Sequence, residues 1–358
     1  MRVPPRWVRR VVIAPLVIVA AVLLLAATPL WFVLALALAS LVPRFVRFPR
    51  VLWLVTVYLV WDAAVLIVML LLWVASGFGW KIRTQGFVRA HYVVGRVALR
   101  ALFRVFRAVL RLRIIAFGDD DEDPHTGQAA FDRLFTPGTP LIVASRHGGP
   151  GDSLILTHLL LEGARREPRI VLKDTIRWDP AIDTLSSRVP SRFITPSGFG
   201  GRAPGSTTAA EQIGDLAMGL DENDALVIFP EGGQISPRRR SQRIEQLRSS
   251  GLDEFADRAE DLLNVMPPQP AGLNAALAAA PDADMIFIAH TGLDHFQNIG
   301  DFWRGLPMNK QLIMRAWRVP RSKIPEEREA QAKWLFGWFE RIDFWIADRT
   351  ATDDPDLP

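Results

Sequence analysis

The chain has 358 residues and no cysteine, which excludes disulfides, thiolate nucleophiles and cysteine-bound metals. This length suffices for one catalytic domain of ordinary size and a membrane region. The formal net charge of +4 hides an asymmetry, because residues 81–113 carry many arginines and no acid. Such a segment favours an anionic membrane surface. Nucleic acid is the competing partner, but it does not explain the apolar runs beside the segment, so we expect no nucleic-acid binding.

Two long apolar runs precede the basic segment. Residues 11–42 contain no charge and are broken only by Pro15 and Pro29, and residues 51–76 are interrupted only by Asp62. Both exceed the roughly 20 residues that cross a bilayer, so residues 1–80 are predicted to be membrane-embedded helices. The first run is compatible with one tilted helix or with a hairpin near Pro29. Asp62 is compatible with a functional role at membrane depth or with packing between the two runs.

The basic segment, taken as residues 81–118, is predicted to be interfacial, with a basic amphipathic helix over residues 88–113. Its arginines recur at helical spacing, with apolar residues largely on the other side. Such a helix can lie among lipid headgroups, or it can pack on the domain with a solvated basic face. Because the largest basic cluster follows the second run, the positive-inside rule places the following domain in the cytoplasm, at the cell membrane.

Residues 119–350 are predicted to form one α/β domain with a mostly parallel sheet flanked by helices. Residues 198–205 are rich in Gly and Pro and are predicted to be a mobile loop, and residues 351–358 a flexible acidic tail. The predicted strands are 141–145, 170–172, 192–195, 225–229, 285–289 and 311–319. The predicted helices are 153–163, 208–220, 242–264 and 325–348.

Two polar motifs each follow a predicted strand, where ligands bind in open α/β sheets. The first contains His147 and Asp152, separated by a glycine-rich stretch that can fold tightly. A carboxylate on one imidazole nitrogen fixes the tautomer and raises the basicity of the other, which suits proton abstraction from an alcohol. Asp152 is equally placed to cap the next helix. The second motif is Phe229-Pro230-Glu231-Gly232-Gly233.

Together the two motifs resemble those of the lysophospholipid acyltransferase family, which carries a His-x4-Asp block and a downstream Phe-Pro-Glu-Gly block. The resemblance covers roughly residues 140–295. It implies that His147 is the general base, oriented by Asp152, and that the hydroxyl of a membrane lipid attacks a fatty acyl thioester. It implies no cofactor, with acyl-CoA or acyl carrier protein as co-substrate.

The resemblance also suggests substrate-binding residues. Glu231, Gly232 and Gly233 would shape the acceptor site. Arg202 is the candidate for an acceptor-phosphate contact and is also compatible with an ordinary loop arginine. Lys173 resembles a lysine that the family has near this point. We expect the substrate-binding set to be Glu231, Gly232, Gly233, Arg202, Lys173 and Arg146.

The sequence departs from the family pattern at both motifs. Arg146 stands where the family usually has Asn, and Gly233-Gln234 stand where it usually has Thr-Arg. The missing arginine puts lysophosphatidate itself in doubt as acceptor, although residues 238–240, all arginines, follow closely and could substitute. A solvated surface run is the other interpretation of these arginines. His290 is compatible with a hydrogen-bonded strand-end histidine, which we favour, or with a polar group facing the site.

Two other function classes compete. The stretch His147-Gly148-Gly149-Pro150-Gly151 resembles the oxyanion loop of proline iminopeptidases in the α/β-hydrolase fold, which would make the protein an esterase or peptidase. That mechanism requires a Gly-x-Ser-x-Gly nucleophile elbow, and the sequence contains none. A non-catalytic lipid-binding membrane protein is the third possibility, and turnover of a thioester would distinguish it from the acyltransferase.

Overall fold

A computed structural model describes residues 3–39, 47–119, 123, 126–149, 151–194, 208–292 and 311–352. The chain divides into two compact units. The first comprises Met1–Leu112, Leu172–Gly200 and Ile299–Asn309, and the second Arg113–Val171, Gly201–Asn298 and Lys310–Pro358. The predicted loop 198–205 lies outside the described residues, as do the residues of the predicted tail beyond 352.

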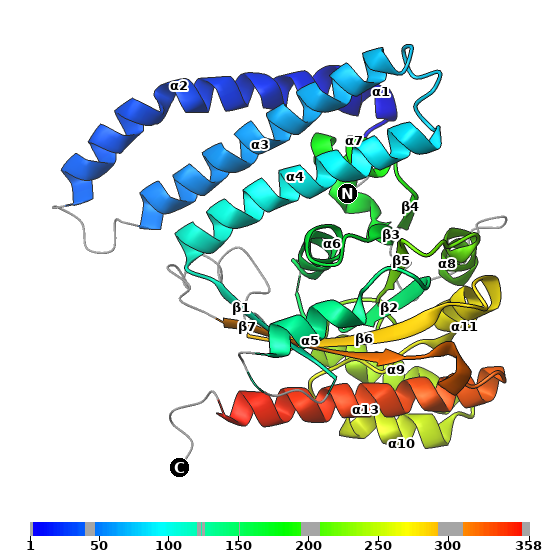
Figure 1. Cartoon of the computed structure of the whole chain (residues 1–358). Coiled ribbons are helices and arrows are strands. Elements are labelled where there is room, and N and C mark those ends of the chain that lie inside the picture. The colour runs from blue at the N-terminus through cyan, green and yellow to red at the C-terminus, as the bar shows by residue number, and fades with distance from the viewer. Residues whose placement is uncertain are drawn as a thin grey trace. The chain divides into compact units, whose positions relative to one another are not determined.

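Long helices dominate the first unit. Helix α1 (Arg6–Val8) and the short π-helical segment η1 (Arg9–Ile13) lead into α2 (Ala14–Ala39), followed by α3 (Arg47–Ala75) and α4 (Gln85–Leu110). Helices α2, α3 and α4 lie side by side (Figure 1). Helix α2 continues through Pro29, so the first apolar run is one helix and not a hairpin. Pro29 cannot donate within the helix, but Thr28 Oγ1 donates to the carbonyl of Leu24 at 2.9 Å.

Two helical stretches, Arg6–Ala35 and Pro49–Ala75, are long and apolar enough to cross a membrane. In the first stretch Leu30 is 71% exposed and Val33 69% exposed, whereas the core helix of a soluble protein buries such residues. The second stretch buries Val65 and Met69 among the described residues. By length and composition, both stretches could cross a membrane.

A second segment of the first unit contains η2 (Asp174–Trp178), α7 (Pro180–Ser186) and the strand β4 (Ser191–Ile194). Asp62 of α3 accepts a hydrogen bond from the amide of Ala181 at 3.1 Å, and Tyr58 donates to Asp179. Asp179 also caps α7, accepting from the amide of Ile182 at 2.7 Å. The acid in the second apolar run therefore has a packing role, because it holds the start of α7.

Helix α4 is amphipathic, as its sequence predicts. Val94 and Ala98 pack with the buried residues of α3, and Trp61 Nε1 donates to the carbonyl of Ala98 at 2.8 Å. Arg104 and Arg107 are exposed on the other side. Part of the apolar face is therefore covered by protein, and the basic face remains accessible.

The α/β part is a seven-stranded sheet with the order β1-β7-β6-β2-β5-β3-β4. The strand pairs β1/β7, β2/β5, β2/β6 and β3/β5 are parallel, and β6/β7 is antiparallel. This confirms the predicted fold class. The remaining strands are β1 (Arg113–Gly118), β2 (Leu141–Ser145), β3 (Glu167–Lys173), β5 (Asp224–Ile228), β6 (Asp284–Thr291) and β7 (Gln311–Val319).

The helices of the second unit differ from prediction at three points. The helices Gly127–Leu134 and Pro270–Ala279 were not predicted. The predicted helix 242–264 is wrong, because the chain forms two helices separated at Gly251. Gly251 has φ +71°, and the amide of Leu252 turns back to the carbonyl of Leu247 at 3.0 Å. The helices are α5 (Gly127–Leu134), α6 (Asp152–Glu162), α8 (Ala209–Ala217), α9 (Pro237–Ser249), α10 (Asp253–Asp261), α11 (Pro270–Ala279), the 3₁₀ turn η3 (Arg321–Lys323) and α13 (Arg328–Thr352).

In the second unit, successive side chains of each strand point to opposite faces of the sheet. Ile142 and Ala144 of β2 join a cluster with buried residues of α8, α11 and α13, including Phe339. Leu141 and Val143 point to the opposite face and are also fully buried. Helices α6 and α13 lie on opposite sides of the sheet (Figure 1). Because both faces are covered, the strand ends are the places where polar side chains can meet a ligand.

Candidate active site

The carboxyl ends of three neighbouring strands form the candidate site. β2 lies between β5 and β6 and is parallel to both, so the three ends meet at one edge of the sheet. The ladder extends one residue past β2, because the amide of Arg146 donates to the carbonyl of Ile288 at 3.1 Å. The loop that carries His147 therefore starts from a fixed point.

The structure brings His147 and Asp152 into contact. His147 Nδ1 lies 3.1 Å from Asp152 Oδ2, and the same oxygen accepts from the amide of Gly149 at 2.7 Å. Asp152 is the first residue of α6, and Gly151 holds the cap position. The carboxylate thus reaches back across the loop to the imidazole. When it accepts the Nδ1 hydrogen, Nε2 becomes the basic nitrogen of the ring.

The charge of Asp152 is favoured despite its burial. Burial alone would raise the pKa of this carboxyl, but the nearby His290 and the hydrogen bonds from His147 and Gly149 outweigh it, so the pKa lies below the ordinary value. His290 Nε2 lies 3.6 Å from Asp152 Oδ2 and 3.2 Å from the carbonyl of Arg146. His290 is therefore a hydrogen-bonded strand-end histidine that also adjoins the site.

Glu231 connects the loop that carries His147 to the segment before α11 through two hydrogen bonds. It follows β5, is 3% exposed, and receives the amide of His147 on Oε1 at 2.6 Å. Its other oxygen, Oε2, receives the amide of Met266 at 2.9 Å. Burial raises the pKa of Glu231 to about 7, although the two amide hydrogen bonds and Arg146 oppose the shift. Both carboxylate oxygens are thus engaged by the protein's own backbone.

Arg146 supports the same loop. The residue is 3% exposed, and its Nη1 donates to the carbonyl of His290 at 2.6 Å. Its Nε donates to the carbonyl of Asn264 at 3.2 Å. The guanidinium therefore joins the loop to the end of β6 and to the segment before α11.

The second motif packs closely around the imidazole. The rings of Phe229 and His147 lie 4.7 Å apart between centroids, which limits rotation of the imidazole. Gly232 has φ +68°, and a Cβ there would lie 2.5 Å from Gln269 Nε2. Gln269 itself donates its amide to the carbonyl of Pro230 at 2.8 Å. The positive φ therefore favours glycine at position 232.

Of the three consecutive arginines, Arg239 lies at the second motif. A Cβ added to Gly233 would clash with the Arg239 guanidinium, so that group sits against the glycine. Ser236 caps α9 by accepting from the Arg239 amide at 3.3 Å, and the side chain of Arg239 is exposed. Arg240 is engaged elsewhere, since its Nε donates to the carbonyl of Leu262 at 2.7 Å.

Lys173 and Arg202 are the other two residues of the predicted substrate-binding set. Lys173 is the last residue of β3, half-buried, and belongs to the first unit. Arg202 lies outside the described residues. In turn, sequence reasoning missed Asn264, Met266 and Gln269, which contribute mainly through backbone groups and carry no recognisable motif.

Comparison with known proteins agrees with these motifs. No curated protein matches the chain. Residues 126–281, somewhat less than half of the chain, match the family model described as Acyltransferase, and this range contains both motifs. The match at residues 126–281 is to the 1-acylglycerol-3-phosphate acyltransferase family, whose motifs the sequence resembles.

Proposed function

We propose that this acyltransferase is membrane-bound and moves a fatty acyl group from a thioester to a hydroxyl of a lysophospholipid or related glycerophosphate. The observation that carries the proposal is the contact of 3.1 Å between His147 Nδ1 and Asp152 Oδ2, at a sheet edge within the acyltransferase domain. The co-substrate is acyl-CoA or acyl carrier protein, and no cofactor takes part.

The chemistry follows from the orientation of the imidazole. Nε2 of His147 takes the proton of the acceptor hydroxyl as its oxygen attacks the thioester carbonyl. The tetrahedral intermediate collapses to the new ester and expels the thiolate, which recovers the proton from the imidazolium. Asp152, whose pKa is lowered, remains ionised and stabilises the imidazolium during this step. No covalent acyl-enzyme is formed.

Glu231 and Arg146 are positioning residues in this scheme. Their polar atoms are bound to main-chain groups of the protein, and both hold the loop that presents His147. A general base is effective only when it is within hydrogen-bond reach of the proton it removes. The buried Glu231 and Arg146 therefore contribute to rate through geometry.

Among the described residues, Arg239 is our candidate for a contact with an acceptor phosphate. It is exposed beside Gly233, where the family usually has Thr-Arg. Arg239→Gln is expected to raise the acceptor KM by about tenfold with little change in kcat, because a phosphate contact is made in ground and transition states alike. Steady-state kinetics with varied acceptor measure this. Arg238→Gln is the matched control, and an equal change in both variants would contradict the assignment.

The apolar helices α2 and α3 are proposed to lie in the cell membrane, with the catalytic domain on the cytoplasmic side, where thioesters are available. The exposed arginines at 104, 107 and 111 of the basic segment would then meet anionic headgroups. In mixed micelles, activity is expected to rise with the fraction of anionic lipid and to fall with salt. Replacing these three arginines with glutamine should flatten both dependences, and unchanged dependences would remove the segment from this role.

An acyl-transfer assay tests the function as a whole. Purified protein is incubated with a radiolabelled acyl thioester and a panel of lysophospholipids and glycolipids, and the products are separated. Transfer to an acceptor supports the proposal. Release of free fatty acid alone would favour a hydrolase, and no turnover with any acceptor would favour a lipid-binding protein.

A further inference from the structure

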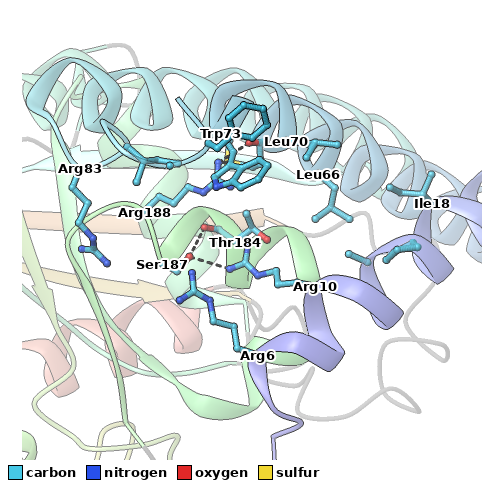
Figure 2. A pocket seen from close by; sticks show the side chains of 16 residues that line it. Arg6, Arg10, Ile18, Leu66, Leu70, Trp73, Arg83, Thr184, Ser187 and Arg188 are labelled. Carbon is cyan, nitrogen blue, oxygen red and sulfur yellow. Dashed lines mark hydrogen bonds between the residues drawn. The ribbon is translucent and has the colours of Figure 1, made fainter. Parts of the chain in front are cut away.

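The first unit contains a cavity of about 630 Å³ with two chemically different ends. One end is lined by four arginines from three places in the chain: Arg6 and Arg10, Arg83, and Arg188. The other end is apolar and includes Ile18 of α2 and Trp73 of α3 (Figure 2). The volume is that of an ordinary ligand pocket.

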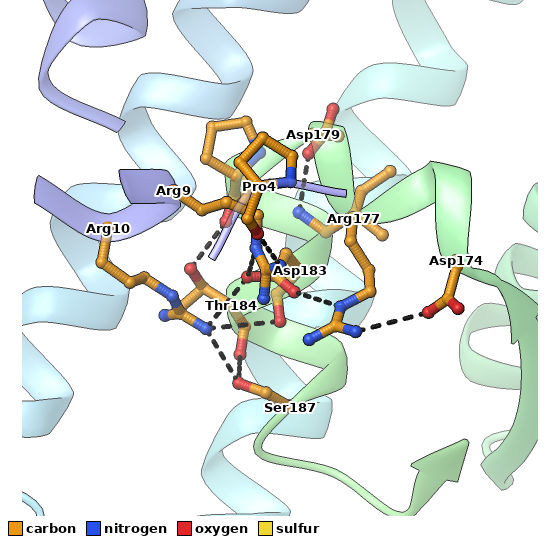
Figure 3. A network of polar contacts seen from close by, with 12 residues as sticks. Pro4, Arg9, Arg10, Asp174, Arg177, Asp179, Asp183, Thr184 and Ser187 are labelled. Atoms are coloured by element: carbon orange, nitrogen blue, oxygen red, sulfur yellow. Dashed lines mark hydrogen bonds and ion pairs between the residues drawn. The ribbon is translucent and has the colours of Figure 1, made fainter. Parts of the chain in front are cut away.

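A buried ion-pair network fixes the basic end. Asp183 of α7 lies 3.2 Å from Arg9 Nε, 3.4 Å from Arg10 Nη2 and 3.3 Å from Arg177 Nε, and its side chain is 2% exposed (Figure 3). Arg177 also pairs with Asp174 at 3.3 Å, so two carboxylates face three guanidinium groups. Asp183 anchors the N-terminal turn to α7, and the network keeps an excess of one positive charge.

The arginines that line the cavity keep unsatisfied charge. Arg10 Nη2 donates to Ser187 Oγ at 3.0 Å, but its buried Nε has no hydrogen-bond partner. Arg188 donates to the carbonyl of Met69 at 2.7 Å, and its pKa falls to about 10 through burial and repulsion by Arg10 and Arg6. Among the residues that the structure describes, Arg6, Arg83 and Arg188 form no ion pair with a carboxylate.

Gathering like charges in a partly buried pocket is costly unless an anion offsets them. A phosphate group matches this requirement, because guanidinium groups bind it through charge-assisted hydrogen bonds. The excess of positive charge at this end therefore indicates an anionic ligand group.

The apolar end lies on helices with the properties of membrane spans. Ile18 and Leu66 come from α2 and α3, and Trp73 packs edge-on against Phe78 with ring centroids 5.2 Å apart. Gly79 has φ +96° and sits so close to Trp73 that a Cβ would lie 2.8 Å from Nε1. The turn after α3 thus closes over the indole and forms an apolar wall beside the arginines.

We infer that this cavity binds an anionic phospholipid, with the phosphate among Arg6, Arg10 and Arg188 and an acyl chain against the apolar wall of α2 and α3. The inference rests on charge and shape complementarity within the first unit, and it does not depend on the proposed reaction. Free phosphate and a phospholipid would make the same contacts with the arginines of the basic end. Only a phospholipid would also make contacts at the apolar end, so that end distinguishes the two ligands.

The test uses the full-length protein in detergent and radiolabelled dioleoyl phosphatidic acid, with dioleoyl phosphatidylcholine as the less anionic probe. Arg6→Gln combined with Arg83→Gln is the main variant, because both side chains are exposed and form no hydrogen bond with the residues that the structure describes. It is expected to lose about tenfold in affinity for phosphatidic acid, the loss of roughly one charge-assisted hydrogen bond. Arg133→Gln combined with Arg328→Gln, exposed and outside the cavity, is the charge-matched control and should bind as the wild type does.

Further arms separate the alternatives. Ile18→Trp should block the apolar end and weaken lipid binding, whereas competition by inorganic phosphate should require a large molar excess over the lipid. Phosphate that competes as well as the lipid would overturn the lipid assignment. Equal losses in the cavity variant and its control would overturn the site. His147→Ala and Arg239→Gln should retain binding, which separates this cavity from the acceptor site.

Discussion

Replacing His147 with alanine is expected to lower acyl transfer roughly a hundred- to ten-thousand-fold, the usual contribution of a positioned general base. The imidazole is held by Asp152 on Nδ1 and lies beside Phe229, which leaves Nε2 to act as the base. Initial rates of labelled acyl transfer, measured with saturating thioester and acceptor, give the loss directly. Near-normal turnover would remove His147 from the mechanism.

Two controls separate chemistry from folding. His158→Ala changes another histidine, on the body of α6, and should retain transfer. Asp152→Asn should show a smaller loss than His147→Ala, because the imidazole survives without its orienting carboxylate. Both active-site variants should elute and melt like the wild type in detergent. A variant that aggregates would show instead that its side chain is needed for folding.

The strands could be predicted from sequence because both faces of the sheet are covered. β2 and β7 have the bounds that the sequence predicts, Leu141–Ser145 and Gln311–Val319. β1 was missed, because its first residue, Arg113, continues the arginine pattern of the preceding helix and hides the change to extended structure. The break at Gly251 was missed because a single glycine within a helical pattern is often tolerated.

The site was predictable where side chains carry the chemistry. His147, Asp152 and Glu231 stand at strand ends in the sequence, and the structure gathers them. The Met266 amide was not predictable, because a backbone donor leaves no trace in residue type. The pairing of Arg9 with Asp183 was also hidden, since 174 positions separate the two residues.

The stability of the fold is expected to decrease as the pH rises from about 4.5 to about 7, because of Glu231. Burial raises the pKa of this carboxyl from 4.5 to about 7, so the folded protein binds the proton more tightly than the unfolded chain does. The stabilisation is fully present below the unfolded pKa and is lost as the pH passes through the folded pKa. A shift of this size corresponds to roughly 3 kcal/mol in the free energy of unfolding.

Glu231→Gln removes the titration while keeping the shape of the protonated acid. At the acidic end of this pH range, the variant should have the same melting temperature as the wild type. Its melting temperature should not change as the pH rises. Asp224→Asn is the control, because burial also raises the pKa of Asp224 but its carboxylate accepts from Arg169 and the amide of Asp221, away from the His147 loop. The Asn variant should retain the part of the slope that belongs to Glu231. If the melting temperatures of the wild type and of Glu231→Gln fall in parallel as the pH rises, the pH dependence of stability comes from other groups.

The same substitution should nevertheless lower acyl transfer at neutral and higher pH. Only the ionised carboxylate offers an acceptor to both the His147 and the Met266 amides, whereas glutamine must turn its NH₂ group toward one of them. A donor facing a donor displaces the loop that presents the imidazole. Glu231→Gln is therefore expected to be the more stable and the slower enzyme above pH 7, because the wild type maintains a buried charge in order to hold its base in place. Full activity in this variant would show that the two amide hydrogen bonds do not position His147.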